Sequence, residues 1–215
     1  MAFFHAGPAP RSAGPRPGLL RDSLRLEPGL RVGLLGGSFN PAHEGHAHVA
    51  ETAMQRLGLD RVIWLVSPQN PLKDASETAP LADRMASARE FARSPAMVVS
   101  DFESRVGCRW TVDTLRAITA RHPGVKFVWL MGSDNLATFH RWRGWTDIAS
   151  AMPMAVIARP GSQLQSRTAP AARRYAAFRV PQEQARLLPD TPAPAWTYLT
   201  APLNRASSTA IRAAG

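Results

Sequence analysis

The chain has 215 residues, 45% of them hydrophobic, and a formal net charge of +10 from 26 Lys and Arg against 16 Asp and Glu. A chain of this length can bury the core of one domain, and the absence of any run of about 18 apolar residues excludes an evident membrane span. The single cysteine, Cys108, excludes an intrachain disulfide and fits a reducing cytoplasm. The positive charge favours polyanionic ligands but does not choose between nucleic acids and phosphorylated small molecules.

Residues 1–29 carry five prolines among Gly and Arg. They offer too little apolar surface to order themselves, so they are predicted to form a flexible Pro- and Arg-rich leader. No continuous apolar stretch of the kind found in secretory signal peptides occurs there, whereas an Arg-containing transit peptide stays open as an alternative. The folded domain is expected to span residues 30–215.

Short apolar strands alternate with segments at helical spacing through that domain. Strands are predicted at residues 31–35, 61–66, 97–100, 125–131, 154–158 and 196–199. Helices are predicted at residues 46–57, 81–93, 110–122 and 207–214, with another around 171–178. This alternation predicts a single α/β domain with a Rossmann-like, doubly wound parallel sheet and helices on both faces. Ligands of such sheets bind beyond the carboxyl ends of the strands, so the loops there are the places to seek chemistry.

The loop after the first strand reads Gly36-Gly37-Ser38-Phe39-Asn40-Pro41-Ala42-His43-Glu44-Gly45-His46. Its two glycines permit a sharp turn and a close approach of phosphate. The helix that follows offers unpaired N–H groups to an anion. His43 and His46, three residues apart, project from one side of that helix start, and Gly45 leaves no side chain between them. The sequence of this loop therefore predicts a site that binds the phosphate of a nucleotide.

Spacing disfavours several other interpretations of this loop. Neither G-x-G-x-x-G nor G-x-x-x-x-G-K-[ST] occurs after the strand. A zinc-protease motif needs its second His four residues after the first, where this chain has Ala47. A metal site built from His43, His46 and His48 is disfavoured because His48 should point away from the other two on a helix. No metal site formed by the protein is predicted.

The loop resembles the G-G-[ST]-F-D-P-x-H-x-G-H signature of the H-x-G-H nucleotidyltransferases. Asn40 stands where that signature usually has Asp, so a turn or cap role is retained and a role that needs a carboxylate is questioned. Near the C-terminus, Ser207-Ser208-Thr209-Ala210-Ile211-Arg212 resembles the family element I-S-S-T-x-I-R, with Ala206 replacing the leading Ile. A hydroxyl-rich helix start of this kind binds phosphate, and Arg212 can clamp two oxygens.

Further segments resemble the nicotinate-nucleotide adenylyltransferases within that superfamily. Lys73, after the second strand, would place a point charge near phosphates. The segment from Trp110 to Leu115 resembles the helix start that holds the nicotinate carboxylate in these enzymes. Asp134, in a Gly-Ser-Asp-Asn-Leu loop, suits a ribose or adenine contact, and Trp142 matches an aromatic residue that stacks on the pyridine. The resemblance covers about residues 31–161 and the C-terminal helix, in the same order along the chain.

This resemblance implies transfer of AMP from ATP to nicotinic acid mononucleotide, which gives deamido-NAD and pyrophosphate in NAD synthesis in the cytoplasm. It implies Mg²⁺ bound to the phosphates mostly through water. Its implied catalytic residues are His43, His46, Lys73 and Arg212. Its implied ATP-binding residues are Gly36, Gly37, Ser38, Phe39, His43, His46, Gly132, Asp134, Ser207, Ser208, Thr209 and Arg212. Its implied acceptor-binding residues are Asn40, Lys73, Thr111, Asp113 and Trp142.

Three alternatives stay open. The acceptor could be nicotinamide mononucleotide or phosphopantetheine, since spacing does not separate an acid from an amide. A basic nucleic-acid-binding module is the alternative from another class, although the sequence has no recognisable RNA-binding motif, and neither nucleic acid nor a membrane is expected as a partner. A non-catalytic relative is suggested by Asn40 and Ala206 but disfavoured by the retained His43, His46 and Arg212. The oligomeric state is not predicted.

Overall fold

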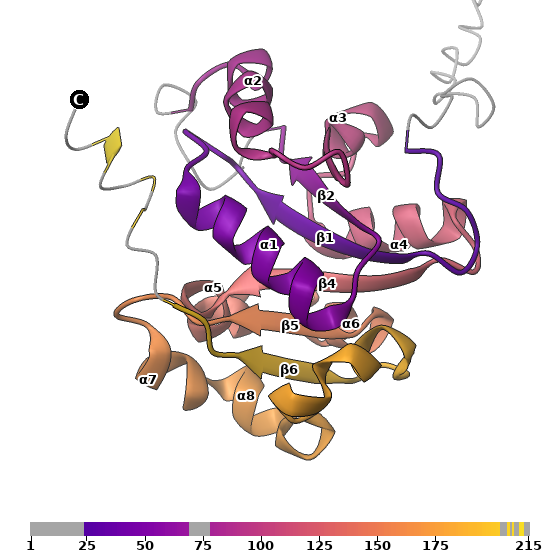
Figure 1. Ribbon diagram of the computed structural model, residues 1–215, viewed down its shortest axis with the longest axis vertical. Helices are drawn as coiled ribbons and strands as arrows, with labels where there is room; N and C mark the ends of the chain where they lie inside the picture. The colour runs from indigo at the N-terminus through magenta and orange to yellow at the C-terminus, as the bar shows by residue number, and fades with distance from the viewer. Residues whose placement is uncertain (1–23, 69–77, 203–205, 207, 209–210, 213–215) are drawn as a thin grey trace, which may run out of the picture.

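The computed structural model describes residues 24–68, 78–202, 206, 208 and 211–212. Six strands form one parallel sheet in the order β3-β2-β1-β4-β5-β6 (Figure 1). The strands are β1 (Arg31–Gly37), β2 (Arg61–Val66), β3 (Met97–Ser100), β4 (Lys126–Gly132), β5 (Met154–Ile157) and β6 (Trp196–Leu199). The predicted strands and the predicted parallel, doubly wound sheet are confirmed.

The strand order reverses between β1 and β4. From β1 the chain winds outward through β2 to β3, and from β4 it winds the other way through β5 to β6. Loops that leave the carboxyl ends of two such neighbouring strands run in opposite directions, which opens a crevice between them. The loop after β1 and the loop after Gly132 flank this point.

Helices cover both faces of the sheet, as Figure 1 shows for α1 in front of it. The longer helices are α1 (Glu44–Leu57), α2 (Leu81–Phe91) and α4 (Thr111–Arg121). The shorter α-helices are α3 (Phe102–Val106), α5 (Ser133–Thr138), α6 (Trp145–Ala151), α7 (Gln163–Arg167) and α8 (Pro170–Arg174). The 3₁₀ segments are η2 (Phe139–Arg141), η3 (Ala176–Phe178) and η4 (Gln182–Asp190).

Two hydrophobic cores lie against the two faces of the sheet. One contains residues of α3, α4, α5, α6 and α8, and the other contains residues of α1, α2 and η4. Along β1 the side chains alternate, since Val32 and Leu34 belong to the first core and Leu35 to the second. Every strand therefore buries both faces, which explains why the strands read as continuous apolar runs.

Four details differ from the sequence-based expectation. The first helix begins at Glu44 rather than at residue 46. The short elements α3, α5, α6, α7, η2 and η4 were not predicted. The helix expected around residues 171–178 is split into α8 and η3. Leu24, inside the predicted leader, is buried in the first core, so packing begins before residue 30. No helix in the described part of the chain combines the length and apolarity needed to cross a membrane.

Candidate active site

The first loop ends in a helix cap made by two histidines. His43 is the N-cap of α1, and its Nδ1 accepts a hydrogen bond from the Gly45 N–H at 3.1 Å. The His46 Nδ1 accepts one from the His43 N–H at 3.3 Å, which completes a reciprocal capping box. The two rings lie 3.9 Å apart between centroids and are tilted by 33°. The three-residue spacing of His43 and His46 thus lets the two side chains cap the helix and also brings their rings together.

These hydrogen bonds fix the chemical state of both imidazoles. Because each Nδ1 accepts a backbone N–H, the neutral ring carries its proton on Nε2 and can donate it. Burial and nearby Arg159 together lower the pKa of His43 to about 4, against a smaller raising by Asp134. Burial, His43 and Arg159 lower the pKa of His46 to about 3. At neutral pH the pair therefore presents two uncharged N–H donors.

The lowered histidine pKa values predict a loss of stability in acid. The unfolded chain binds protons at these histidines near pH 6.5 while the folded chain does not, so their contribution to the free energy of unfolding is complete above pH 6.5. That contribution should fall by up to about 1.4 kcal/mol per pH unit per histidine as the pH drops towards 4. Urea unfolding between pH 7.5 and 4.5 measures the slope.

The control for this experiment is the double variant His43→Asn, His46→Asn, which lacks both titrating rings. Glu103 works in the opposite direction, because its pKa is raised to about 7 and its protonation favours the folded state as the pH falls. The difference between wild type and the double variant isolates the histidines. Equal slopes for the two proteins would show that the rings are not held neutral by the fold.

Phe39 and Trp64 form an aromatic pair that packs against His46. Phe39 is buried and packs edge-on against His46, with ring centroids 4.8 Å apart, and stacks on Trp64 at 5.2 Å. Its φ of 47° is unusual for a side chain of this size. A strained backbone of this kind persists where packing over-determines it, here the burial of the ring between the first loop and β2.

The C-terminal segment docks onto the same loop. The Ser208 hydroxyl donates to the Pro41 carbonyl at 2.9 Å, and the Arg212 guanidinium donates to the Asn40 carbonyl. A Cβ added at Gly45 would lie 2.8 Å from the Ala206 carbonyl oxygen, so only glycine leaves room for this approach. Two segments more than 150 residues apart, which resemble the two halves of one family signature, are in direct contact.

Asp134 and Arg159 lie beside this contact. The Arg159 guanidinium donates to the Asp134 carboxylate at 3.2 Å and to the Ala206 carbonyl at 2.8 Å. Its backbone N–H donates to the Ser133 hydroxyl. A Cβ at Gly132 would lie 2.3 Å from the Asp134 carboxylate and 2.6 Å from Arg159. Arg159 thereby joins the loop after β4 to the C-terminal segment.

A cavity of about 650 Å³ opens beside the first loop at the carboxyl ends of the strands. Its lining residues are Gly36, Gly37, Ser38, Ser67, Pro68, Glu103, Arg109, Trp110, Thr111, Trp129, Thr138, Arg141, Trp142 and Arg143. Three tryptophans give it flat apolar walls, and three arginines make it basic. Its size suits a mononucleotide-sized ligand. The histidines are not among the lining residues, but they follow Ser38 in the same loop.

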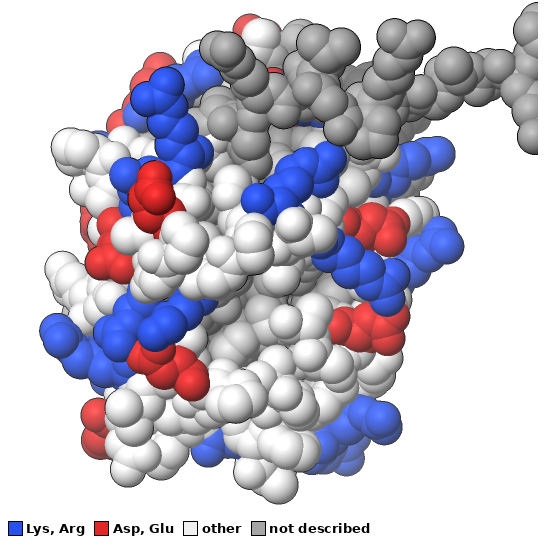
Figure 2. All heavy atoms as spheres, turned by 90° about the vertical axis from the view of Figure 1, so that its right-hand side faces the viewer, with Lys and Arg blue, Asp and Glu red and all other residues white. Residues whose placement is uncertain are grey.

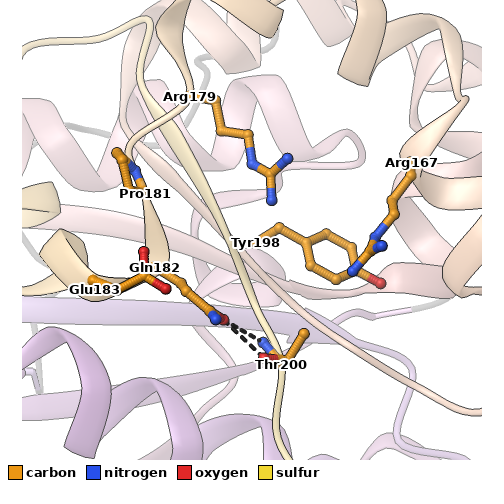
Figure 3. A pocket seen from close by; sticks show the side chains of 7 residues that line it. All are labelled: Arg167, Arg179, Pro181, Gln182, Glu183, Tyr198 and Thr200. Atoms are coloured by element: carbon orange, nitrogen blue, oxygen red, sulfur yellow. Dashed lines mark hydrogen bonds between the residues drawn. The ribbon is translucent and has the colours of Figure 1, made fainter.

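A second cavity, of about 370 Å³, lies beside β6 (Figure 3). Tyr198 lies there between two arginines, with the guanidinium carbons of Arg167 and Arg179 at 5.3 and 5.9 Å from its ring centroid. The Gln182 side-chain oxygen accepts hydrogen bonds from the N–H and the hydroxyl of Thr200. None of the site residues predicted from the sequence lines this cavity, so the candidate site is the larger one.

Comparison with known proteins bears on the same residues. A family model described as cytidylyltransferase-like matches residues 34–214. A curated protein from Caulobacter sp. (strain K31), named probable nicotinate-nucleotide adenylyltransferase, is 67% identical over 183 residues, which cover 85% of this chain and 97% of the relative. One from Cereibacter sphaeroides with the same name is 53% identical over 86% of this chain and 97% of its own length.

The chain belongs to the nicotinate-nucleotide adenylyltransferase family.

Solved structures support the fold at lower identity. The nicotinic acid mononucleotide adenylyltransferase of Plasmodium falciparum, in its complexes with APC and with NaAD, superposes with a TM-score of 0.63. The identity is 15% and 16% for the two complexes, and each covers 86% of this chain and 83% of the other. The Rossmann-like sheet is therefore shared with enzymes whose sequences have diverged widely.

Within this family member, the structure brings together only part of the predicted site. Gly36, Gly37, Ser38, Thr111 and Trp142 line the large cavity. Asn40 is buried, and its side-chain oxygen accepts a hydrogen bond from the Ala79 N–H. That contact needs an oxygen but no charge, so asparagine serves it as well as aspartate.

Asp113 is not brought into the cavity. As the third residue of α4 it faces outward, while Val112 and Leu115 on either side face the core. Its carboxylate forms an exposed ion pair with Arg116 at 3.9 Å. Three of the predicted site residues lie outside the described part of the chain, namely Lys73, Ser207 and Thr209.

Sequence reasoning missed a buried arginine that organises the site. Arg84 of α2 is 2% exposed and donates to the carbonyls of Ser38, Ser67, Pro68 and Ala79. It therefore joins the loop after β1, the loop after β2 and the start of α2. Its sequence context, with an acid before it and a methionine after it, gives no sign of burial.

The surface charges and the possible metal ligands of the described residues indicate a function less specifically than the cavity does. Figure 2 faces the edge where the parallel strands begin, and basic side chains are interspersed there with acidic ones, as in the pairing of Arg31 and Lys126 with Asp190. Among the described residues, no group of three or more His, Cys, Asp or Glu side chains could hold a metal ion.

Proposed function

We propose that the chain transfers AMP from ATP to nicotinic acid mononucleotide, giving deamido-NAD and pyrophosphate in NAD biosynthesis. The observation that carries this proposal is the contact between the first loop and the C-terminal segment beside a basic, tryptophan-walled cavity. Such a site can hold a triphosphate at the helix start and a flat heterocycle in the cavity. The names of the close relatives support the same reaction.

The reaction needs positioning and charge neutralisation more than acid–base chemistry. An oxygen of the acceptor's 5′-phosphate forms a bond to the α-phosphorus of ATP, and the bond from that phosphorus to the bridging oxygen of pyrophosphate breaks. The acceptor phosphate is already ionised at neutral pH, so no base has to activate it. The gain comes from holding the reacting groups in line and meeting the charge that develops on the phosphoryl oxygens.

We assign His46 to the transferring phosphoryl group, with His43 supporting it. Each ring offers an Nε2–H donor that remains uncharged at neutral pH. Arg212 and Lys73 are proposed to neutralise the triphosphate, Ser208 to bind its oxygens, and Asp134 to contact the ATP ribose or adenine. Ser207 and Thr209 complete the proposed phosphate-binding helix start.

ATP is proposed to enter as its Mg²⁺ complex, with the ion held by phosphate oxygens and water as part of the substrate. Mg²⁺ keeps several waters in sites of this kind, which fits the lack of a described acidic cluster. We place the reaction in the cytoplasm, where the single cysteine would stay reduced. Neither nucleic acid nor a membrane is required by this function.

Release of pyrophosphate tests the proposal directly. The purified protein is incubated with ATP and Mg²⁺ and, separately, with nicotinic acid mononucleotide, nicotinamide mononucleotide or phosphopantetheine. We expect the fastest release with the nicotinic acid compound. Faster release with another acceptor would reassign the substrate, and release with none of them would reject the adenylyltransferase function.

Trp142 is expected to serve binding of the acceptor. It lies in the cavity wall and is held edge-on against Phe139 and Trp129, with ring centroids 5.5 and 6.4 Å away. Trp142→Ala should raise the KM for the mononucleotide by about tenfold, because stacking of an aromatic ring on a base contributes about 1–3 kcal/mol. The turnover number should change much less.

The matched control is Trp142→Phe, which keeps an aromatic face and should retain most of the affinity. Steady-state kinetics with the mononucleotide varied at saturating ATP separates the two constants. An unchanged KM in the alanine variant would remove Trp142 from the acceptor site.

A further inference from the structure

Among the described residues that line the large cavity, one is an acid, Glu103. This residue belongs to the short helix α3, which follows the carboxyl end of β3. It is 9% exposed, and the described part of the chain gives it no ion pair. It shares the cavity with Thr111 and Trp142, the residues assigned to the acceptor. A buried carboxyl group thus lies in a cavity proposed to receive an acidic substrate.

The hydrogen bonds around Glu103 suit a protonated carboxyl group. The Thr114 hydroxyl oxygen lies 3.2 Å from the Glu103 carboxyl oxygen and 3.2 Å from the Trp110 carbonyl oxygen. A hydroxyl has one proton and cannot donate to two acceptors at once. If Glu103 carries a proton, it donates to Thr114 and Thr114 donates to Trp110, so both contacts are satisfied. If Glu103 is ionised, one of them is lost.

Burial is the main influence on the charge state of Glu103. Burial raises its pKa to about 7, against a smaller lowering by Thr114. Cys108, whose own thiol pKa is raised by burial and by Glu103, is its titratable neighbour before α4. On its own helix, Arg105 pairs with Asp101. From the other elements, Arg109, Arg141 and Arg143 line the same cavity without forming an ion pair with it among the described residues.

We propose that Glu103 is a specificity-determining residue that admits the carboxylate of the acceptor only when its own carboxyl group is protonated. This inference rests on the proposed function. A neutral Glu103, whose proton is donated to Thr114, adds no negative charge next to an anionic carboxylate in the cavity. An ionised Glu103 places a second negative charge at the same place, and two carboxylates that share a site cannot both stay ionised.

The consequence is a pH dependence that distinguishes acid from amide acceptors. Between pH 6.5 and 8, the KM for nicotinic acid mononucleotide should rise roughly tenfold, as expected for a group that titrates near 7. Nicotinamide mononucleotide has the same phosphate and no acid, so its KM, or its inhibition constant if it is turned over slowly, should change little. The ratio of the two constants removes the titration of the phosphate.

Glu103→Gln is the matched variant, because its amide can donate to Thr114 as a protonated carboxyl does and cannot ionise. In this variant the ratio of the two constants should be flat with pH. Circular dichroism and ATP binding report whether the variant folds. If it does not fold, the wild-type ratio alone still decides, since a merely structural role for Glu103 would affect both acceptors alike.

The outcomes separate this inference from the proposed function. A pH-dependent ratio in the wild type, flattened by Glu103→Gln, supports the inference. Normal turnover of nicotinic acid mononucleotide with a ratio independent of pH, or a ratio that stays pH-dependent in Glu103→Gln, overturns the inference and leaves the proposed function standing. Absence of turnover with this acceptor at every pH overturns the proposed function itself.

Discussion

His46→Ala is expected to lower kcat by about two to three orders of magnitude while changing nucleotide affinity by much less. Removing one preorganised donor that meets developing charge has effects of that size in other enzymes. The Nε2–H of His46 is fixed by the capping bond from the His43 N–H to its Nδ1, so it needs no reorganisation when the charge develops. Binding of ATP, which has other contacts, should weaken only a few-fold.

The control is His48→Ala, on the same helix and two positions further on. Two positions along a helix turn a side chain by roughly 200°, away from His46, so His48→Ala should keep kcat within about threefold of wild type. Rapid-quench measurement of AMP transfer in a single turnover reports the chemical step directly. Near-normal transfer in His46→Ala would show that the phosphoryl group is met elsewhere.

The fold could be predicted largely from the sequence because its strands are buried on both faces. Continuous apolar runs such as residues 61–66 admit few interpretations once helical segments alternate with them. The short elements were less accessible. η4 contains Pro189 and follows a 3₁₀ rather than an α-helical period, so the pattern used to find helices does not occur in it.

The start of α1 shows a second limit of sequence reasoning. The expected start at residue 46 rested on apolar residues at helical spacing, and histidine is not among the usual N-cap residues that would reveal an earlier start. The structure shows His43 as the cap, with His46 as its reciprocal partner. The same hydrogen bonds set the tautomer of both rings, a property that spacing alone does not reveal. The contact of the two distant segments was expected only through the family resemblance.

Burial of polar residues was the least predictable feature of the site. Glu103 sits in a polar stretch, Asp101 to Arg105, that reads as a solvated loop. It is buried because α3 packs beside β2 and Thr114 of α4 contacts its side chain, and both contacts depend on the tertiary fold. The outward direction of Asp113 follows from its place in α4, between two residues that face the core. A motif match alone did not give that direction.

Arg84→Met is expected to destabilise the fold by at least about 3 kcal/mol and to lower kcat/KM together with stability. The substitution keeps an apolar stem of similar length but removes donors that now satisfy four carbonyl groups. Each buried carbonyl left without a donor costs about 1–3 kcal/mol. Because three of the four belong to Ser38, Ser67 and Pro68 in the cavity wall, the loss should also disorder the acceptor site.

Two further variants make the result specific to the buried guanidinium. Arg89→Met lies on the exposed side of the same helix and should change the free energy of unfolding by less than about 0.5 kcal/mol. Arg84→Lys should fall between the two, because an ammonium group is a compact donor that cannot span acceptors as a planar fork does. Urea unfolding of all three variants gives the ranking. If Arg84→Met were as stable as Arg89→Met, the loops after β1 and β2 would have to be held together by other contacts.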